Sequence, residues 1–374
     1  MSIKILHTAD LHIDSPFAFL PEEKAIFRRR RQLGILEEIV TLAEHHRVDA
    51  LLICGDLFDS PNISFDVTSS VSDILSSTAI PVFIAPGNHD YFHLGSPYNL
   101  NVWPENVHIF KSSAIERIEL PQMTLYGAGF TSPNLFRSTL SNFSLGNNSD
   151  TGGFYKPSVI MLHGELNPRE PIYHPVYTND IAACGADYLA LGHIHSRTEP
   201  QKVGNTVFAF SGCPEGRGFD ETGSKGMYLV ELGRGVNMTF LPLSGAKYYD
   251  LTVNLTGNDS PAKEIINALP SQSQEDLFRI TLSGEIEPNL ISIEEISKSI
   301  SPLVFYAEII NRTKLPRDIW SYCSEDTLRG TFLSLLREKM DESASNEDRE
   351  IIDLAARYGL DALEGEEADY LDNF

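Results

Sequence analysis

Short runs of apolar and β-branched residues recur up to residue 245, each followed by a polar turn and often by a longer amphipathic stretch. Alternation of strand-length apolar runs with helical stretches is typical of α/β proteins. Residues 22–46 place apolar side chains at helical spacing, and residues 64–78 indicate a second helix. The predicted strands are Ile3–Leu6, Ala50–Cys54, Val82–Ala85, Val159–Leu162, Tyr188–Leu191 and Thr206–Phe210.

The pattern changes after residue 245. Residues 248–312 alternate strand and helix signals, so we expect a small βαβαβ domain there. From Glu325 the chain is helical by propensity and acidic, with fifteen acidic and five basic residues. We therefore divide the chain into a main domain of residues 1–245, a small domain of residues 246–322 and an acidic helical tail of residues 323–374. Two apolar stripes in the tail flank a polar hinge at 343–346: Leu328, Phe332, Leu335 and Leu336, then Ile351, Ile352, Leu354 and Ala355.

Composition limits the classes of function. With 42% hydrophobic and 22% charged residues and no apolar run near the ~18 residues of a membrane span, the sequence predicts a globular protein outside the membrane. The apolar stretch at the N-terminus is too short for a signal peptide, so we expect a cytoplasmic location. A net charge of −23 argues against unaided binding to DNA. Binding would need cations, a partner subunit or the run of arginines at 28–31, which is more typical of a solvated helix face.

Metal-binding side chains follow five of the predicted strands. Because open α/β sheets place their ligand sites at the carboxyl edge, we expect these side chains to meet there. The donors are carboxylate, imidazole and amide groups without thiolate, which favours manganese, iron or zinc in a catalytic site over a structural zinc. Each motif is weak alone, but the ordered set is a strong signal. The predicted ligands are Asp10, His12, Asp56, Asn88, His163, His193 and His195.

Separate roles can be assigned within this set. Two cations ~3.5–4 Å apart need a bridging anionic ligand, and Asp56 is the predicted bridge. His89 directly follows the ligand Asn88 and is the predicted general acid, with Asp90 orienting its imidazole ring. Glycines next to the ligands are expected to permit tight turns: Gly55, Gly87, Gly164 and Gly192.

The ordered motifs resemble those of a known family. Asp10-Leu11-His12, Gly55-Asp56, Gly87-Asn88-His89-Asp90, His163-Gly164 and Gly192-His193-Ile194-His195 are similar to the motifs of calcineurin-like metallophosphoesterases. The strings His7–His12 and Gly55–Asp59 resemble the DNA-repair nuclease branch of Mre11 and SbcD. The run Gly216–Gly223, leading to Lys225-Gly226, resembles the bacterial YhaO-type exonuclease subunits.

The resemblance implies a four-layer αββα sandwich with two central sheets, and manganese as the usual activating ion. By position, the first metal ion would take Asp10, His12, Asp56 and His195. The second would take Asp56, Asn88, His163 and His193. His89 would be the transition-state histidine. Some relatives carry a second histidine where this chain has Asp59, so no assisting role is assigned to that position.

The resemblance also implies an activity and partners. The protein would be a DNA exonuclease or endonuclease, with residues 246–322 as a capping domain that positions DNA. The tail would dock on the coiled coil of an SMC-like ATPase of the Rad50 or SbcC type, and a homodimer remains open. The alternatives are a stand-alone phosphatase or small-nucleotide phosphodiesterase, and an inactive scaffold. The intact ligand set counts against the scaffold, and the extra domain and tail count against the stand-alone enzyme.

Overall fold

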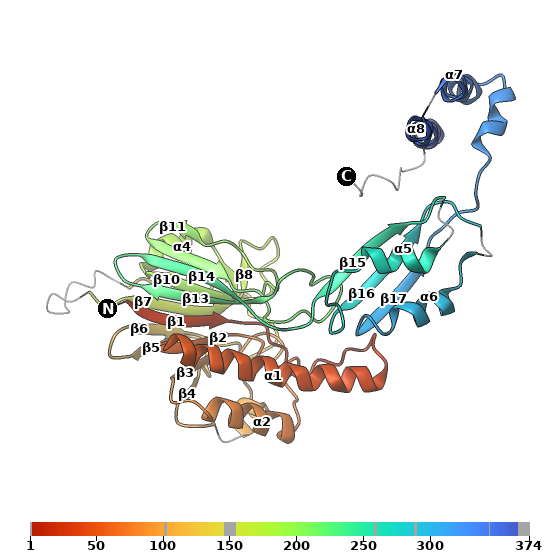
Figure 1. Cartoon of the computed structure of the whole chain (residues 1–374). Coiled ribbons are helices and arrows are strands. Elements are labelled where there is room, and N and C mark those ends of the chain that lie inside the picture. Colours follow the sequence, from red (N-terminus) through yellow and green to blue (C-terminus); the bar gives the residue numbers. More distant parts are fainter. Residues whose placement is uncertain are drawn as a thin grey trace. The chain divides into compact units, whose positions relative to one another are not determined.

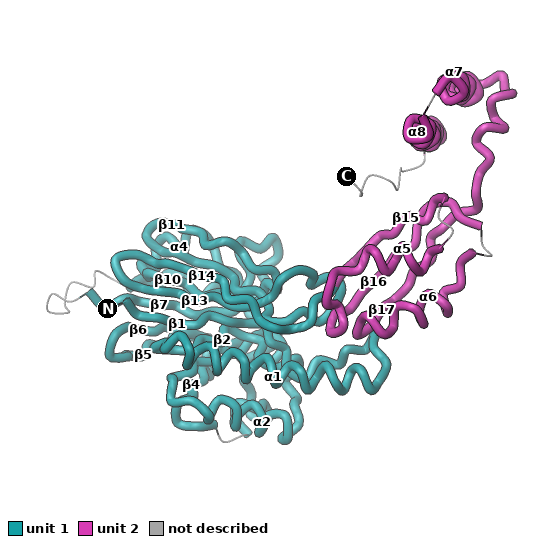
Figure 2. The backbone as a smooth tube through the Cα atoms, viewed as in Figure 1, with its two compact units in different colours: residues 1–248 teal, residues 249–374 magenta. Residues whose placement is uncertain are grey.

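The computed structural model describes residues 2–100, 103–145, 155–257, 260–287, 290–343 and 345–365. The chain separates into two compact units, residues 1–248 and 249–374, drawn in teal and magenta in Figure 2. Each unit has hydrophobic clusters of its own. The boundary falls three residues after the end of the predicted main domain.

Two six-stranded sheets form the centre of the first unit (Figure 1). In the first sheet the strand order is β14-β13-β1-β2-β3-β4: β14 (Val236–Pro242), β13 (Gly226–Leu232), β1 (Ile3–Thr8), β2 (Ala50–Cys54), β3 (Val82–Ala85) and β4 (Val107–Ile109). In the second the order is β11-β12-β10-β7-β6-β5: β11 (Gln201–Val203), β12 (Thr206–Phe210), β10 (Tyr188–Gly192), β7 (Ser158–His163), β6 (Thr124–Gly127) and β5 (Glu116–Glu119).

All six predicted strands are present, as β1, β2, β3, β7, β10 and β12. Their apolar runs are continuous because both faces of a parallel sheet are covered. Strand β2 shows this, since Leu51 and Ile53 pack toward the helices while Leu52 and Cys54 pack toward the other sheet. The sequence did not predict β13 and β14, which extend the first sheet by antiparallel pairing of β13 with β1.

Helices cover the outer faces of both sheets. The helices α1 (Glu22–His46) and α2 (Phe65–Ser76) pack on the first sheet, and α4 (Thr178–Cys184) packs on the second. A separate apolar core fills the space between the sheets. The predicted αββα sandwich is therefore confirmed. Short elements complete the unit: α3 (Pro97–Leu100) and the paired strands β8 (Glu165–Leu166) and β9 (Pro175–Val176).

The second unit begins with the expected alternation of strands and helices. A three-stranded sheet of order β15-β16-β17 alternates along the chain with two helices: β15 (Tyr248–Asn254), α5 (Pro261–Ala268), β16 (Leu277–Ser283), α6 (Ile293–Ile300) and β17 (Tyr306–Asn311). A 3₁₀ helix, η2 (Ile319–Ser324), leads to α7 (Leu328–Glu342) and α8 (Asn346–Glu364). None of the helices within the described ranges combines the length and the apolar character that a membrane span requires.

The tail helices bury only part of the predicted stripes. Leu333 of α7 packs with Ala356 and Leu360 of α8, and Phe332 and Leu336 lie against this cluster. Other residues of the stripes face outward, because two short helices can bury only one narrow strip between them. The exposed apolar side chains are Leu328, Leu335, Ile351 and Leu354.

Candidate metal centre

Five parallel strands deliver their following residues to one edge of the sandwich. Strands β1, β2 and β3 run parallel in the first sheet, and β7 and β10 run parallel in the second. Asp10 and His12 follow β1, Asp56 follows β2, and His163 is the last residue of β7. The loops after β1 and β2 are joined by backbone hydrogen bonds from Asp10 to Gly55 and from His12 to Asp56. Asn88 follows β3, and His193 and His195 follow β10, so all seven predicted ligands lie at this edge.

The backbone at this edge is unusual. Asp10, His12, Asp56 and His193 all have positive φ angles, of 57°, 46°, 50° and 102°. Positive φ is uncommon for residues other than glycine and costs on the order of 1–3 kcal/mol each, and such residues cluster at functional sites. The strain indicates that the fold holds these four side chains in place for a reason other than stability.

The first predicted set of donors converges. His12 Nε2 lies 3.2 Å from His195 Nε2 and 3.5 Å from Asp56 Oδ2. His195 Nε2 lies 3.8 Å from Asp10 Oδ1. Asp10, His12 and His195 are one of the acid and histidine groups compact enough to hold a metal ion.

The second predicted set shares an atom with the first. His163 Nε2 lies 3.3 Å from Asp56 Oδ2, the same oxygen that approaches His12. Asn88 Oδ1 lies 3.1 Å from His163 Nε2 and 3.2 Å from His193 Nδ1. Asp56 therefore stands between the two sets, where a bridging carboxylate belongs.

These spacings fit metal ligands. Donors that each lie ~2.0–2.2 Å from a metal ion stand roughly 3.0–3.6 Å apart in octahedral or tetrahedral coordination. The distances within each set run from 3.1 to 3.8 Å. The donors are imidazole nitrogens, carboxylates and one amide oxygen, which suits manganese, iron or zinc. The residues present thus fit two divalent ions.

The histidine rings are oriented by polar contacts at their other nitrogens. His163 Nδ1 lies 2.9 Å from the carbonyl oxygen of Cys54, which can only accept, so Nδ1 carries a proton. His12 Nδ1 lies 3.0 Å from Asp59 Oδ1, and His195 Nδ1 lies 2.5 Å from Glu221 Oε1. In the neutral ring of His163, Nε2 is then unprotonated and available to a metal ion. The carboxylates beside His12 and His195 favour the same tautomer, although Arg217 Nη2 also lies 3.2 Å from His195 Nδ1.

The electrostatics of the edge differ from one histidine to the next. Burial lowers the pKa of His163, but the carboxylates of Asp56 and Asp10 outweigh burial and raise that pKa to about 9. Burial raises the pKa of Asp10, which the neighbouring histidines oppose. For His193, burial and then the charge of His163 lower the pKa to about 3. A cation bound here would take the place of the proton on His163.

Close approach, more than backbone freedom, explains most of the glycines at the site. Only Gly55 has a positive φ, of 92°. A Cβ atom on Gly87 would lie 2.1 Å from Asp56 Oδ1, and one on Gly192 would lie 1.8 Å from the carbonyl oxygen of Cys54. The prediction that turns require these glycines thus holds for Gly55, whereas Gly87 and Gly192 leave space for neighbouring strands and ligands.

His89 lies at the mouth of the site. It is exposed, and its ring meets that of His12 edge-on with centroids 4.8 Å apart. His89 Nδ1 lies 3.2 Å from the carbonyl oxygen of Asp59, which leaves Nε2 free to exchange a proton with a substrate. His12, Asp56 and His89 also form a group compact enough for a metal ion, so geometry alone permits either role.

Asp90 has a different setting from the one expected. Its buried carboxylate accepts hydrogen bonds from the backbone of Phe58 and Gly87 and from the hydroxyl of Tyr98. Burial, then the charge of Asp56, raises its pKa to about 6. These bonds connect the loops after β2 and β3. The Asp90 carboxylate therefore holds together the two loops that carry the ligands, and it does not orient the imidazole ring of His89.

Three further residues adjoin the site that motif reasoning did not select. Asp59 and Glu221 contact the histidine rings described above, and Arg217 lies between them. In the sequence, the run Gly216–Gly223 is a family resemblance without an assigned role. Its four-residue spacing of arginine and glutamate is a signal for an ion pair, but without the fold nothing placed the pair beside His195.

The run of arginines at 28–31 is not a uniform solvated face. Arg28 is buried, lies 2.9 Å from the carboxylate of Glu215 and packs over the ring of Phe17. A buried guanidinium needs such a partner because desolvating an isolated charge is costly. Arg28 is therefore engaged within the fold and does not offer its charge to DNA.

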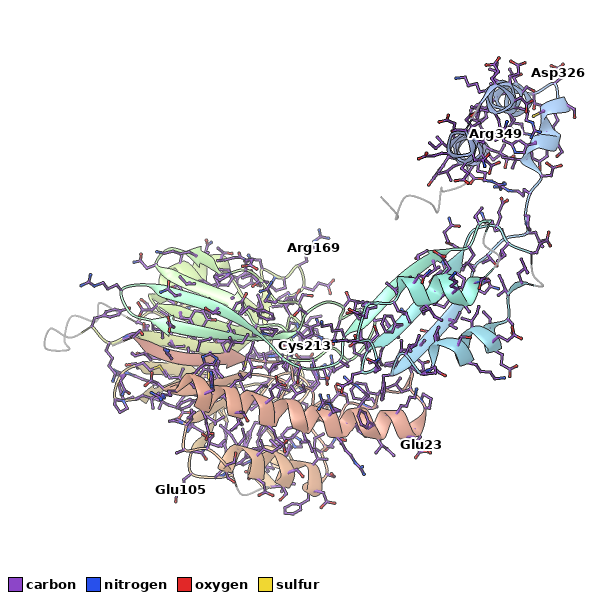
Figure 3. The ribbon with its side chains drawn as sticks, in the orientation of Figure 1. Glu23, Glu105, Arg169, Cys213, Asp326 and Arg349 are labelled. Carbon is purple, nitrogen blue, oxygen red and sulfur yellow. The ribbon has the colours of Figure 1, made fainter. Side chains whose placement is uncertain are left out.

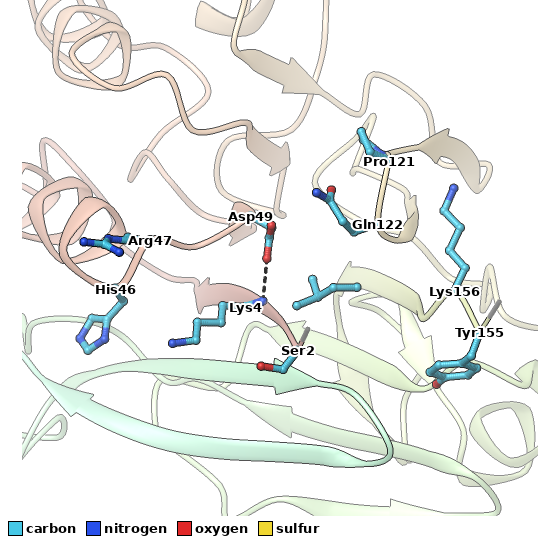
Figure 4. Close-up of a pocket in the computed structure, with 10 residues that line it drawn as sticks. Ser2, Lys4, His46, Arg47, Asp49, Pro121, Gln122, Tyr155 and Lys156 are labelled. Atoms are coloured by element: carbon cyan, nitrogen blue, oxygen red, sulfur yellow. Dashed lines mark hydrogen bonds between the residues drawn. The ribbon is translucent and has the colours of Figure 1, made fainter.

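A separate hollow lies at the amino-terminal edge of the sheets. A cavity of about 830 Å³ is lined by residues that precede or begin β1, β2, β6 and β7 (Figure 4). Asp49 accepts a hydrogen bond from the backbone of Lys4 there, and the ten lining residues include none of the predicted ligands. The charged side chains at this edge do not converge on one point, so the metal centre remains the candidate site.

Comparison with known proteins identifies the family. The family model described as "Calcineurin-like phosphoesterase" matches residues 3–197, which contain all seven predicted ligands. The uncharacterized metallophosphoesterase YhaO of Bacillus subtilis (strain 168) is 33% identical over 248 residues, covering 62% of this chain and 58% of YhaO. The chain thus matches less than two thirds of the length of that relative.

Two proteins whose names refer to DNA repair or to a nuclease are also similar. The DNA double-strand break repair protein Mre11 of Sulfurisphaera tokodaii is 22% identical over 377 residues, covering 95% of this chain and 93% of that protein. The SbcD component of the nuclease SbcCD from Bacillus subtilis (strain 168) is 26% identical over 278 residues, covering 64% of this chain and 68% of SbcD. Together with the acid and histidine groups at the carboxyl edge, the family match shows that this chain belongs to the calcineurin-like phosphoesterases, metal-binding hydrolases that hold two divalent ions.

Proposed function

We propose that the chain is a two-metal DNA phosphodiesterase, an exonuclease or endonuclease that works as the nuclease subunit of a complex with an SMC-like ATPase. The proposal of two-metal hydrolysis rests on the position of Asp56 Oδ2. This oxygen lies 3.5 Å from His12 Nε2 and 3.3 Å from His163 Nε2. One carboxylate oxygen shared by two donor sets is the arrangement that a dinuclear centre needs.

The chain's own residues would divide the work as follows. Asp10, His12, Asp56 and His195 hold one ion, and Asp56, Asn88, His163 and His193 hold the other. Bound divalent ions polarise a phosphoryl oxygen and lower the pKa of a bound water. Asp56 offsets the repulsion between the cations, and the hydrogen bond of His163 to Cys54 keeps Nε2 directed at its ion. Manganese is the proposed activating ion.

His89 would supply the proton for the leaving oxygen. Its exposed ring stands beside His12, and the Nδ1 contact with the carbonyl oxygen of Asp59 fixes the ring while leaving Nε2 open. A general acid must reach the reacting atoms without being committed to a metal ion. Because His89 is exposed at the mouth of the site, its ring can reach a bound substrate.

Support for DNA as the substrate comes from the relatives and from the second unit. Mre11 and SbcD carry names that refer to DNA repair and to a nuclease. The βαβαβ sheet and the tail helices have no use in hydrolysis of a small phosphate ester, so we assign residues 246–322 as the capping domain that positions DNA. The net charge of −23 requires that metal ions or a partner supply positive charge near the phosphates.

The outer faces of α7 and α8 support the proposed docking of the ATPase. The side chains of Thr327 and Ser345 cap the starts of the two helices, which stabilises the first turn of each helix. The inner strip of the pair is covered by Leu333, Ala356 and Leu360, yet Leu328 and Leu335 remain 72% and 58% exposed. Exposed apolar residues on a helix pair suit a partner's coiled coil. In this proposal the complex is cytoplasmic.

Cleavage assays separate this proposal from the two alternatives. Purified protein loaded with Mn²⁺ is incubated with end-labelled duplex and single-stranded DNA, alone and with a candidate ATPase, and with p-nitrophenyl phosphate and bis-p-nitrophenyl phosphate. Cleavage of DNA that Asp56→Asn abolishes supports the nuclease. Turnover of the small esters without cleavage of DNA would favour the stand-alone phosphatase or phosphodiesterase. Binding of metal without turnover of any substrate would favour the scaffold.

A separate experiment tests the docking surface. Leu328→Glu and Leu335→Glu place charge on the outer face of α7, and Leu94→Glu is the control because Leu94 is 81% exposed in the first unit. The tail variants should lose co-purification with the ATPase and keep Mn²⁺-dependent cleavage of short substrates, and the control should keep both. Retained co-purification of the tail variants would place the interface elsewhere.

A further inference from the structure

A group of three charged side chains, Asp59, Arg217 and Glu221, contacts the first donor set. Arg217 follows β12 in the chain, and its Nη1 lies 2.8 Å from Asp59 Oδ1. Its Nη2 lies 3.1 Å from Glu221 Oε1. Asp59 comes from the loop after β2, so the guanidinium joins segments that are 158 residues apart in sequence.

Each carboxylate in this group also contacts a predicted metal ligand. Asp59 Oδ1, which pairs with Arg217, lies 3.0 Å from His12 Nδ1. Glu221 Oε1, which pairs with the same guanidinium, lies 2.5 Å from His195 Nδ1. One arginine thus fixes two carboxylates, and each carboxylate fixes one imidazole.

The end of the group near Glu221 is held from several sides. The backbone N–H of Arg217 donates to Glu221 Oε2 over 2.8 Å. The thiol of Cys213, a residue labelled in Figure 3, lies 3.7 Å from the same oxygen. The backbone N–H of Cys213 and the ammonium group of Lys225 both donate to the carbonyl oxygen of His195. Both the ring and the backbone of His195 are therefore fixed by this segment.

The two carboxylates influence which ring nitrogen of His12 and His195 carries the proton. A carboxylate at Nδ1 favours the tautomer that keeps the proton there, and in that tautomer a neutral ring presents an unprotonated Nε2. His12 Nε2 and His195 Nε2 lie only 3.2 Å apart. Two lone pairs at that distance repel each other, and a cation between them removes the repulsion. The group thus holds the two Nε2 atoms close enough to share one cation.

We propose that Asp59, Arg217 and Glu221 act as a clamp that positions His12 and His195 for the first metal ion, so that this ion depends on the clamp while the second ion does not. The inference rests on the proposed two-metal function. Asp59, Arg217 and Glu221 are positioning residues, since none of them belongs to the donor sets. The second donor set is oriented independently, because His163 Nδ1 is held by the backbone of Cys54.

The competing explanation is an ion-pair network that only joins loops. The two differ in what a substitution should change. Asp59→Asn and Glu221→Gln keep an acceptor oxygen and nearly the same shape but remove the charge that holds the imidazole. Glu199→Gln is the matched control, because Glu199 pairs with Arg197 over 3.4 Å close to His195 and its side chain is 80% exposed.

The experiment titrates metal-free full-length protein with Mn²⁺ and measures the two dissociation constants, and records the visible absorption of the Co²⁺-loaded protein. In Asp59→Asn and in Glu221→Gln we expect one ion to bind roughly 10–100-fold more weakly, the size usual for residues that orient metal ligands. The other ion should bind as in the wild type, the Co²⁺ spectrum should change for the weakened site alone, and Glu199→Gln should match the wild type.

The other possible results each argue against the clamp or against the proposed function. Unchanged binding of both ions in both variants would overturn the clamp. Equal weakening of both ions together with a lower melting temperature would reduce it to a structural network. If Glu221→Gln does not fold, Asp59→Asn decides, because the Asp59 side chain is 20% exposed and tolerates the change more readily. A wild-type protein that binds no metal would refute the proposed function itself, a result distinct from failure of the clamp.

Discussion

Replacing Gly87 with alanine should place a methyl group in space that Asp56 occupies. The new Cβ would lie 2.1 Å from Asp56 Oδ1, 2.6 Å from its backbone nitrogen and 2.8 Å from its Cγ. Carbon and oxygen atoms approach closely at ~3.3–3.6 Å, so the carboxylate must move by about 1 Å. The backbone of Asp56 cannot move with it freely, because its carbonyl oxygen accepts from His12.

The effect on metal binding follows from this displacement. Metal–ligand distances tolerate deviations of only ~0.2 Å, so a shift of about 1 Å removes the shared ligand from both ions. We expect both dissociation constants to rise by at least ~10–100-fold, the loss usual even for residues that only orient the ligands. Overpacking should also lower the free energy of unfolding of the metal-free protein by about 1–3 kcal/mol.

The measurement is the number of Mn²⁺ ions per chain after equilibrium dialysis, with thermal unfolding of the metal-free protein alongside. Gly235→Ala is the control, because a Cβ at Gly235 meets no atom within 4 Å. It should bind two ions and melt like the wild type. If Gly87→Ala also binds two ions with unchanged affinity, Asp56 is not the shared ligand and the bridging assignment fails.

Three further predictions use other parts of the chain. Asp56→Asn should weaken both ions together, whereas His195→Ala should mainly weaken one; equal effects on Mn²⁺ binding would refute the division into two sets. His89→Gln should retain two ions and lose cleavage by roughly 10²–10⁴, the usual contribution of a general acid, and loss of metal would make His89 a ligand. Burial raises the pKa of Glu285, but Arg317 outweighs it and holds that pKa below the ordinary 4.5. The stabilisation is therefore present above pH 4.5 and lost as the pH falls below it. Glu285→Gln should destabilise the second unit by about 1–3 kcal/mol at pH 7, because Arg317 keeps Asp361 as a partner. Urea unfolding should show this difference shrinking in acid, and a pH-independent difference would contradict it.

The carboxyl-edge prediction succeeded because it depends on local pattern. A buried parallel strand needs a continuous apolar run, and the residue after it reaches the ligand edge whatever the rest of the fold does. Asp10, Asp56 and His163 could therefore be placed together from sequence alone. Which ligand binds which ion came from family resemblance, and the assignment remains a prediction that the distances support.

Other features escaped the sequence because they depend on neighbours distant along the chain. Asp90 looked like the partner of His89, yet its carboxylate lies among Phe58, Gly87 and Tyr98. In the tail, helical spacing defined apolar stripes but not which residues face the partner helix. The packing of α7 on α8 selected Leu333, and left Leu335 exposed.

The sequence by itself determined six strands and two helices of the αββα sandwich and the chemistry available at its edge. It did so because hydrophobic periodicity and residue type are local properties. The tertiary structure alone decided that Arg217 meets Asp59, and that Glu221 meets His195. These contacts join residues 158 and 26 positions apart in the sequence. They depend on how two sheets stack and where their loops meet, and no local pattern records that.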